Sequence, residues 1–151
     1  MVGSRRSRGF RAERDLVTKL WARGFAVMRA PASGSKVKRA AYPDVVAIRK
    51  GHVAVFEVKS RSKEENIYIE KEQVDKLVEF ATRASGKAYI AVKVAGSDWV
   101  FIPVELLEPT ASGYKVSREI LARGLNIEQL EVDLGIRETL DKYIKPQHSQ
   151  A

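Results

Sequence analysis

The sequence has no cysteine and only two histidines among its 151 residues. Without cysteine the chain can form neither a disulfide framework nor a cysteine-ligated zinc site, and two histidines argue against a multi-histidine metal site. No run of residues has the length and apolarity of a membrane span. The start, MVGSRRSRGF, lacks the apolar segment of a secretory signal. These absences favour a cytoplasmic protein with no membrane partner.

The sequence has an excess of positive charge. Its 27 lysines and arginines outnumber 19 acidic residues, which gives a formal net charge of +8. Such a balance favours a polyanionic partner, most often nucleic acid. The alternative is a globular protein that is basic without binding a polyanion. The basic residues cluster at two places, Arg5, Arg6, Arg8, Arg11 and Arg14 near the start, and Lys36, Lys38 and Arg39 later.

The hydrophobic patterns predict one α/β domain. Residues 1–8 are expected to form a disordered basic arm. Helical patterns cover 7–23 and 70–84, and a helical pattern from Ser117 onward is broken at Gly124 and Gly135. Short apolar runs predict strands over 25–30, 44–48, 53–59, 87–94 and 99–102. This order, αβββαββα, predicts a central mixed β-sheet flanked by helices.

The segment AAYPDVVAIRKGHVAVFEVKSRS, residues 40–62, places three charged side chains on a predicted β-hairpin. A two-residue and a four-residue loop at the turn RKGH give the same register, in which Asp44 lies opposite Glu57. Directly opposed side chains have Cβ atoms about 4.5–5.5 Å apart. Because side chains alternate along a strand, Glu57 and Lys59 share a face. The three groups are therefore expected to converge, unless a bulge shifts the register.

Two opposed carboxylates repel each other, so one must take up a proton or a cation must lie between them. Mg²⁺ is suitable, because it prefers a few carboxylate oxygens together with waters and phosphates. The first helix offers a third carboxylate, since Glu13 falls on a stripe with Phe10, Val17 and Leu20. Two alternatives stay open. The hairpin charges could form a solvent-facing cluster, and Glu13 could lie at the helix rim and reach water.

Three carboxylates, a lysine and a basic surface suit metal-assisted hydrolysis of phosphodiesters. The metal would polarise the phosphoryl oxygen and acidify a bound water. The lysine would orient or deprotonate that water, or stabilise the charge of the transition state. Basic loops would hold the phosphate backbone. No nucleophile–histidine pairing is evident, which disfavours covalent catalysis of the triad kind.

The dipeptide Pro-Asp44 followed by Glu57-Val58-Lys59 resembles the PD-(D/E)xK nuclease signature. The segments around it follow one another as in archaeal Holliday junction resolvases: GFRAERDLVTKLWARGFAVMRAPASGS, PDVVAI, FEVKSRS, IYIEKEQVDKLVEFATRASGKAYIAVKV and DWVFI. The segment LEVDLGIRETLDKYI is similar to the end of that family. The likeness covers Gly9 to Ile144, so we place the nuclease domain at 9–144 and a flexible tail at 145–151.

This resemblance implies a restriction-endonuclease-like fold and a homodimeric, nucleoid-associated endonuclease. The enzyme would depend on Mg²⁺, with Mn²⁺ able to substitute, and would resolve four-way (Holliday) DNA junctions during homologous recombination and repair. Glu13, Asp44 and Glu57 match metal-binding carboxylates, Lys59 the catalytic lysine, and the carbonyl of Val58 a further metal ligand. The residues expected to contact DNA are Arg8, Arg11, Arg14, Arg29, Ser33, Ser35, Lys36, Lys38 and Lys93.

The second predicted helix departs from the family pattern, which places two aromatic residues at the subunit contact. Phe80 matches the first, but Ala84 and Ser85 stand where the second would fall. Other functions stay open. A RecB-like or restriction-type nuclease would use the same catalytic residues on ends, flaps or specific sites. A non-catalytic junction binder would not need carboxylates aimed at phosphate, and a splicing-type RNA endonuclease would need a histidine, for which His52 and His148 are poorly placed.

Overall fold

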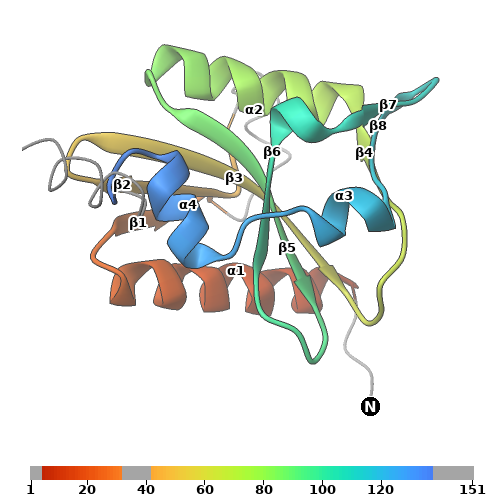
Figure 1. Ribbon diagram of the computed structural model, residues 1–151, viewed down its shortest axis with the longest axis horizontal. Coiled ribbons are helices and arrows are strands. Elements are labelled where there is room, and N and C mark those ends of the chain that lie inside the picture. The colour runs from red at the N-terminus through yellow and green to blue at the C-terminus, as the bar shows by residue number, and fades with distance from the viewer. Residues whose placement is uncertain (1–4, 32–41, 138–151) are drawn as a thin grey trace, which may run out of the picture.

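Two β-sheets and the helices around them make up the part of the chain that the computed structural model describes, residues 5–31 and 42–137 (Figure 1). In chain order the elements are α1 (Arg5–Ala22), β1 (Ala26–Arg29), β2 (Val45–Arg49), β3 (His52–Arg61), β4 (Ile67–Glu70), α2 (Lys71–Arg83), β5 (Lys87–Val94), β6 (Val100–Pro103), the 3₁₀ helix η2 (Val104–Leu106), β7 (Glu108–Pro109), β8 (Gly113–Val116), α3 (Arg118–Ala122) and α4 (Ile127–Asp133).

The larger sheet has the strand order β1-β2-β3-β5-β6. Only the β3–β5 pair in it is parallel, and the other neighbours are antiparallel. The predicted central mixed sheet is therefore confirmed. A smaller antiparallel sheet, β4-β8-β7, was not predicted, and its strands lie in segments for which no strand was predicted.

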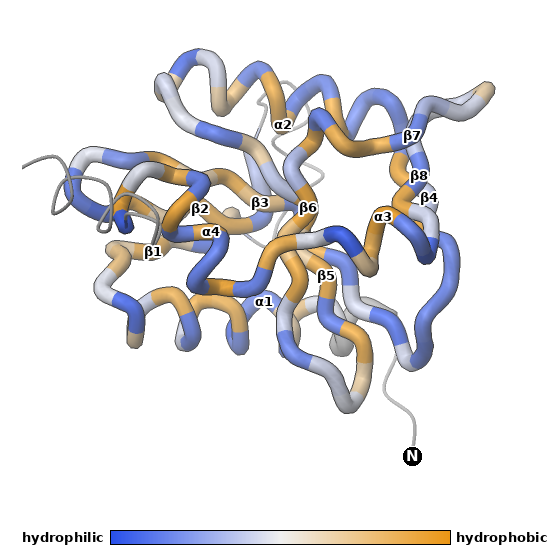
Figure 2. The backbone as a smooth tube through the Cα atoms, viewed as in Figure 1, coloured by the Kyte–Doolittle hydropathy of each residue, from blue (hydrophilic) through white to orange (hydrophobic). Residues whose placement is uncertain are grey.

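The central sheet is covered on both faces, and β3 supplies residues to both cores. Ala54 and Phe56 pack into a cluster with Leu16 of α1 and with residues of α4. Val55, which points to the opposite face, packs with Leu77 of α2. Figure 1 shows α1 and α2 on opposite sides of the sheet, and Figure 2 shows apolar residues gathered along the central strands. No helix among the described residues is long and apolar enough to cross a membrane.

The helix ends differ slightly from those predicted. Helix α1 begins at Arg5 rather than at Ser7, so residues 5–8, assigned to a basic arm, belong to the helix. Helix α2 ends at Arg83, where Ser85 takes the left-handed conformation with φ 52°. The glycine after the helix, Gly86, is required by a close approach, because a Cβ atom there would lie 2.6 Å from the Val53 carbonyl oxygen.

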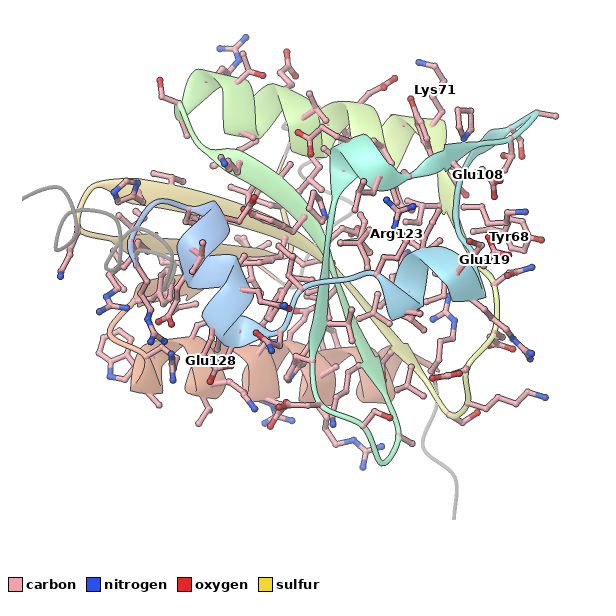
Figure 3. All side chains as sticks on the ribbon, in the orientation of Figure 1. Tyr68, Lys71, Glu108, Glu119, Arg123 and Glu128 are labelled. Carbon is pink, nitrogen blue, oxygen red and sulfur yellow. The ribbon has the colours of Figure 1, made fainter. Side chains whose placement is uncertain are left out.

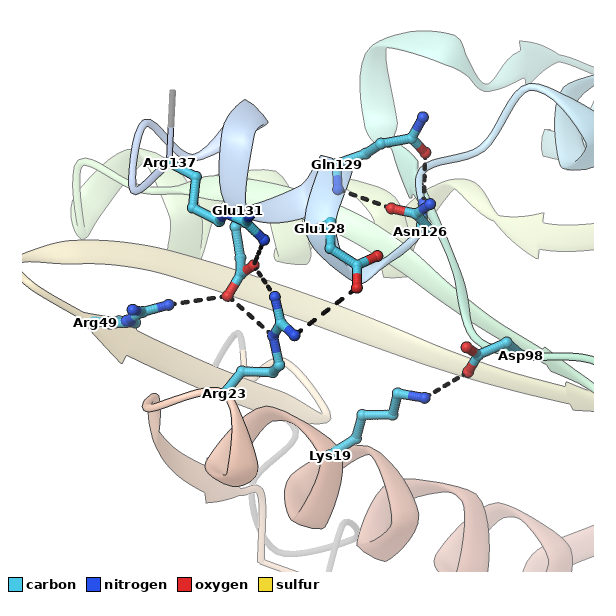
Figure 4. Close-up of polar contacts among 9 residues, drawn as sticks. All are labelled: Lys19, Arg23, Arg49, Asp98, Asn126, Glu128, Gln129, Glu131 and Arg137. Atoms are coloured by element: carbon cyan, nitrogen blue, oxygen red, sulfur yellow. Dashed lines mark hydrogen bonds and ion pairs between the residues drawn. The ribbon is translucent and has the colours of Figure 1, made fainter. Parts of the chain in front are cut away.

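A buried carboxylate ties α4 to α1 and β2. Glu131 is 1% exposed, and it accepts hydrogen bonds from Arg23 (Nε, 3.2 Å), Arg49 (Nη1, 2.9 Å) and Arg137 (Nη1, 3.3 Å) (Figure 4). Burial acts to raise the pKa of Glu131, but the hydrogen bonds and charges of Arg23 and Arg137 outweigh it and hold that pKa below its usual range. Glu131 is therefore ionised, and its carboxylate pairs with three guanidinium groups.

Replacing this carboxylate should destabilise the fold. We expect Glu131→Gln to lower the free energy of unfolding by about 3 kcal/mol, because it leaves three arginines without their buried counter-charge. Denaturant unfolding measures the change. The matched control is Glu128→Gln on the same helix, whose side chain is 55% exposed and 3.8 Å from Arg23. Its effect should stay within about 0.5 kcal/mol. Equal losses in the two variants would contradict the role assigned to Glu131.

Candidate active site

The hairpin brings Asp44 and Glu57 together at one end of the central sheet. Its turn has two residues, Lys50 and Gly51, with φ 51° and 79°, as in the left-handed turns that match strand twist. The register runs from Arg49↔His52 to Val45↔Phe56, as the sequence predicted. The regular ladder ends there, because the Asp44 N–H donates to the Phe56 carbonyl at 3.0 Å.

Although the backbone of Asp44 leaves this register, its carboxylate stays beside β3. Its Oδ2 accepts a hydrogen bond from the Val58 N–H at 2.8 Å. Burial, the negative charge of Asp44 and a hydrogen bond to its carboxylate together raise the pKa of Glu57 to about 9, against the opposing charge of Lys59. Glu57 is therefore protonated at neutral pH. Protonation is one of the two outcomes predicted for opposed carboxylates.

Glu13 lies at the flank of α1 rather than on its innermost stripe, which differs from the prediction. The fully buried positions are Leu16 and Leu20, with Ala12 nearly so, and Glu13 is offset from them by one residue. Its side chain is 18% exposed and accepts hydrogen bonds from Arg29 Nε (3.4 Å) and Nη2 (3.3 Å). Glu13 therefore lies at the rim of the helix, as one alternative had it, but its carboxylate is paired with Arg29.

Glu13 also interacts electrostatically with the hairpin carboxylates. Burial and the charge of Asp44 raise its pKa, while the hydrogen bond and charge of Arg29 act in the opposite direction. The charge of Glu13 contributes in turn to the raised pKa of Glu57. Since α1 packs on the face of the sheet that carries Phe56, it approaches Asp44 from the side opposite Glu57. The three predicted carboxylates thus form one electrostatic group.

Glu13, Asp44 and Glu57 have oxygen ligands suited to a divalent cation, but their side chains are not arranged around a common point. Among the described residues, no three acidic or histidine side chains are placed to hold a metal ion. Glu13 is turned to Arg29 instead. The pKa of Glu57 is raised partly because the negative charge of Asp44 is not neutralised. A hard cation, which prefers carboxylate oxygens, would neutralise that charge. Asp44 and Glu57 are therefore the two residues best placed to receive it.

A cavity of about 560 Å³ lies beside this group and is lined by Lys59. The ammonium of Lys59 acts to lower the pKa of Glu57, so both the cavity and the acidic pair lie within its reach. Tyr68 of β4 lines the same cavity. Tyr68 was not among the predicted site residues because no strand was predicted there, although the alternation of buried Ile67 and Ile69 with exposed residues is a period-two signal.

The predicted DNA-binding residues have different surroundings. Arg11 and Arg14 are exposed on α1. Arg29 is engaged by Glu13 and lies 5.9 Å from the centre of the Phe10 ring. Lys93 of β5 donates to the Ser97 carbonyl. Arg8 lies in α1, and Ser33, Ser35, Lys36 and Lys38 lie outside the described residues, as do His148 and the predicted tail at 145–151.

A mixed sheet whose hairpin carries Pro-Asp44 and Glu57-Val58-Lys59 at one end, with a helix glutamate beside them, defines a nuclease of the PD-(D/E)xK class. The sequence model described as archaeal Holliday junction resolvase (Hjc) matches residues 4–138. The chain belongs to this family, as the resemblance in its motifs indicated.

Individual relatives agree with this assignment. The crossover junction endodeoxyribonuclease Hjc of Sulfurisphaera tokodaii is 40% identical over 146 residues, which cover 95% of this chain and 100% of that protein. The protein of the same name from Archaeoglobus fulgidus is 38% identical over 125 residues, covering 83% and 90%. The solved structure of Archaeoglobus fulgidus Hjc, a Holliday junction resolvase, has a TM-score of 0.75 at 35% identity and covers 82% of this chain and 98% of that one.

The acidic pair predicts a pH-dependent metal affinity. Because Glu57 holds its proton up to about pH 9, Mg²⁺ must displace that proton, and its affinity should rise from neutral pH until Glu57 ionises unaided. Calorimetric titration in buffers of different ionisation enthalpy measures the proton released. Asp44→Asn should weaken binding, whereas Asp98→Asn, at an exposed aspartate paired with Lys19, should not. A metal affinity independent of pH over this range would contradict the assignment.

Proposed function

We propose that this chain is a Mg²⁺-dependent endonuclease that resolves four-way DNA junctions by paired hydrolysis of phosphodiester bonds in homologous recombination and repair. One observation carries the proposal: the carboxylate of Glu57 interacts with that of Asp44 and with the ammonium of Lys59, in a chain of the archaeal resolvase family. The relatives named crossover junction endodeoxyribonuclease support this substrate. A cytoplasmic, nucleoid-associated location follows from it.

Each residue of the site has a role in this reaction. Asp44 and Glu57 would bind the cation, with Glu13 and the Val58 carbonyl as further ligands, and Mg²⁺ or Mn²⁺ when bound polarises the phosphoryl oxygen and acidifies a water. The Val58 N–H holds Asp44 in position at 2.8 Å. Lys59, on the central strand, supplies a positive charge where negative charge develops and can orient or deprotonate the attacking water.

Basic residues near this end would hold the DNA backbone. Arg14 is exposed on the same helix as Glu13, and Arg29 lies directly against Glu13. Phosphate contacts of this kind bind without reading bases. The remaining proposed contacts are Arg8, Arg11, Ser33, Ser35, Lys36, Lys38 and Lys93.

We assign the subunit contact of a homodimer to an apolar strip on the α2 side of the sheet. Helix α2 packs over β3 and β5 and leaves the β1–β2 edge open on that face. Met28, 71% exposed, is paired in register with Val46, and Ile48 is 43% exposed on the same side. On α2, Val78 is 39% exposed and Phe80 is half-buried. A two-fold dimer would present two equal sites to a nearly two-fold junction.

Catalysis should depend on the acidic pair, and binding should not. On a labelled four-way junction with Mg²⁺, we expect Asp44→Asn to slow cutting by about two orders of magnitude or more, because the metal loses a ligand. Junction affinity in a gel-shift assay should stay within a few-fold.

The control protein is Asp98→Asn, which should cut normally, and the control substrate is a linear duplex of equal sequence. Equal cutting of duplex and junction would favour a restriction-type or end-directed nuclease. Undiminished cutting by Asp44→Asn would refute the metal assignment.

The apolar strip gives a second test. Met28→Glu and Val78→Glu should each place a charge in the contact and convert the dimer into a monomer, as light scattering after size-exclusion chromatography would show. Trp21→Glu is the control, since Trp21 is 64% exposed on α1, which packs on the opposite face. Dimers that survive both changes would exclude this surface as the subunit contact.

A further inference from the structure

The cavity beside Lys59 lies between the start of α1 and the strands β3 and β4. It has a volume of about 560 Å³, within the usual size range of small-molecule sites, and its lining includes Gly9, Lys59, Asn66 and Tyr68. Amide and ammonium groups thus face the same space as an aromatic ring. Because Lys59 also acts on Glu57, the cavity adjoins the proposed cleavage site.

Tyr68 presents an aromatic ring to solvent at this cavity. Its neighbours along β4, Ile67 and Ile69, are 1% and 2% exposed, whereas Tyr68 is 63% exposed. Figure 3 shows its side chain at the periphery of the molecule, beside the small sheet. Among the described residues its hydroxyl has no hydrogen-bond partner. One exposed aromatic residue is unremarkable by itself, but here the ring borders a polar cavity next to a predicted catalytic lysine.

Gly9 of α1 also lines the cavity, and it provides an independent observation. It lies inside α1, where glycine stabilises a helix less well than alanine. A Cβ atom built on Gly9 would meet no atom within 4 Å, so packing in this chain does not require glycine there. The fold therefore leaves open space at the point where α1 borders the cavity. Glycine at such a place permits the backbone of a ligand to approach closely.

We infer that this cavity receives one nucleotide of the strand that is cut. Its base stacks on Tyr68, its sugar–phosphate backbone passes over Gly9, and the adjoining phosphate faces Lys59. The inference rests on the proposed junction-cleaving function and adds how the site selects a branched substrate. In a continuous duplex each base is stacked on both sides, and freeing it costs energy. Where strands exchange partners at a branch point, that stacking is interrupted, so a base there reaches Tyr68 at lower cost.

The first test compares Tyr68→Leu with Tyr68→Phe. Base–aromatic stacking predicts that Tyr68→Leu weakens junction binding about fivefold or more, while Tyr68→Phe keeps the wild-type affinity. Trp21→Leu, which removes an exposed aromatic residue from the far part of α1, should change nothing. Affinity for a linear duplex should be the same in all four proteins. A Tyr68→Leu variant with wild-type affinity and wild-type preference for the junction would overturn the inference.

Fluorescence reports on the stacking directly. A junction carrying 2-aminopurine at the branch point, bound without divalent metal so that no cutting occurs, should give a quenched signal with the wild type and with Tyr68→Phe. Tyr68→Leu should give a brighter signal. Equal signals from Tyr68→Leu and the wild type would mean that the base does not stack on this ring.

Gly9→Ala tests the other wall and separates binding from folding. It should raise the thermal midpoint of unfolding by about 2–4 °C, because alanine favours the helix, and it should weaken junction binding, because a methyl group then occupies the path of the backbone. Unchanged binding in the stabilised variant would exclude the path over Gly9.

The proposed function and this inference fail in different ways. Wild-type protein that does not cut a junction with Mg²⁺ would count against the proposed function, whereas the fluorescence signal is read without cutting and judges Tyr68 separately. Wild-type cutting together with unaltered Tyr68→Leu and Gly9→Ala variants would leave the nuclease assignment in place and remove only the nucleotide site.

Discussion

The structure depends on the parallel pairing of β3 with β5. This pairing runs from Ala54↔Lys87 to Arg61↔Val94, along nearly the whole of both strands. In its first half β3 is buried on both faces, with Phe56 facing the α1 side and Val55 the α2 side. A strand held in this way has little freedom to move. Its second half carries Glu57 and Lys59, so the residues with proposed chemical roles lie on a rigidly held strand.

The close placement of Glu13, Asp44 and Glu57 is electrostatically unfavourable, and the surrounding fold maintains it. Ionising Glu57 beside Asp44 costs several kcal/mol, as its pKa of about 9 implies. Two features reduce the negative charge here: Glu57 carries a proton, and the guanidinium of Arg29 pairs with Glu13. A divalent cation would replace both. In this structure Arg29 holds Glu13 beside the acidic pair.

Sequence reasoning succeeded where local rules decide the structure. The register of the hairpin followed from its turn, and the two glycines that break the C-terminal helical pattern do separate α3 from α4 and end α4. It failed where distant segments decide. The small sheet joins Ile67–Glu70 to Gly113–Val116, two four-residue strands whose pairing no local pattern shows. The inward stripe of α1 was misplaced by one residue, because Phe10 and Val17 offered an equally apolar alternative to Ala12 and Leu16. Two of the partners of Glu131 are distant in sequence, since Arg23 follows α1 and Arg49 ends β2.

That arginine cluster around Glu131 makes the stability of the fold depend on temperature in a particular way. The hydration of charged groups becomes less favourable on heating, so the cost of burying them falls as the hydrophobic contribution levels off. A carboxylate shared by three guanidinium groups consequently loses less of its stabilising effect in hot water than packed aliphatic side chains do. The junction of α1, β2 and α4 should thus be among the last parts of this molecule to loosen as the temperature rises.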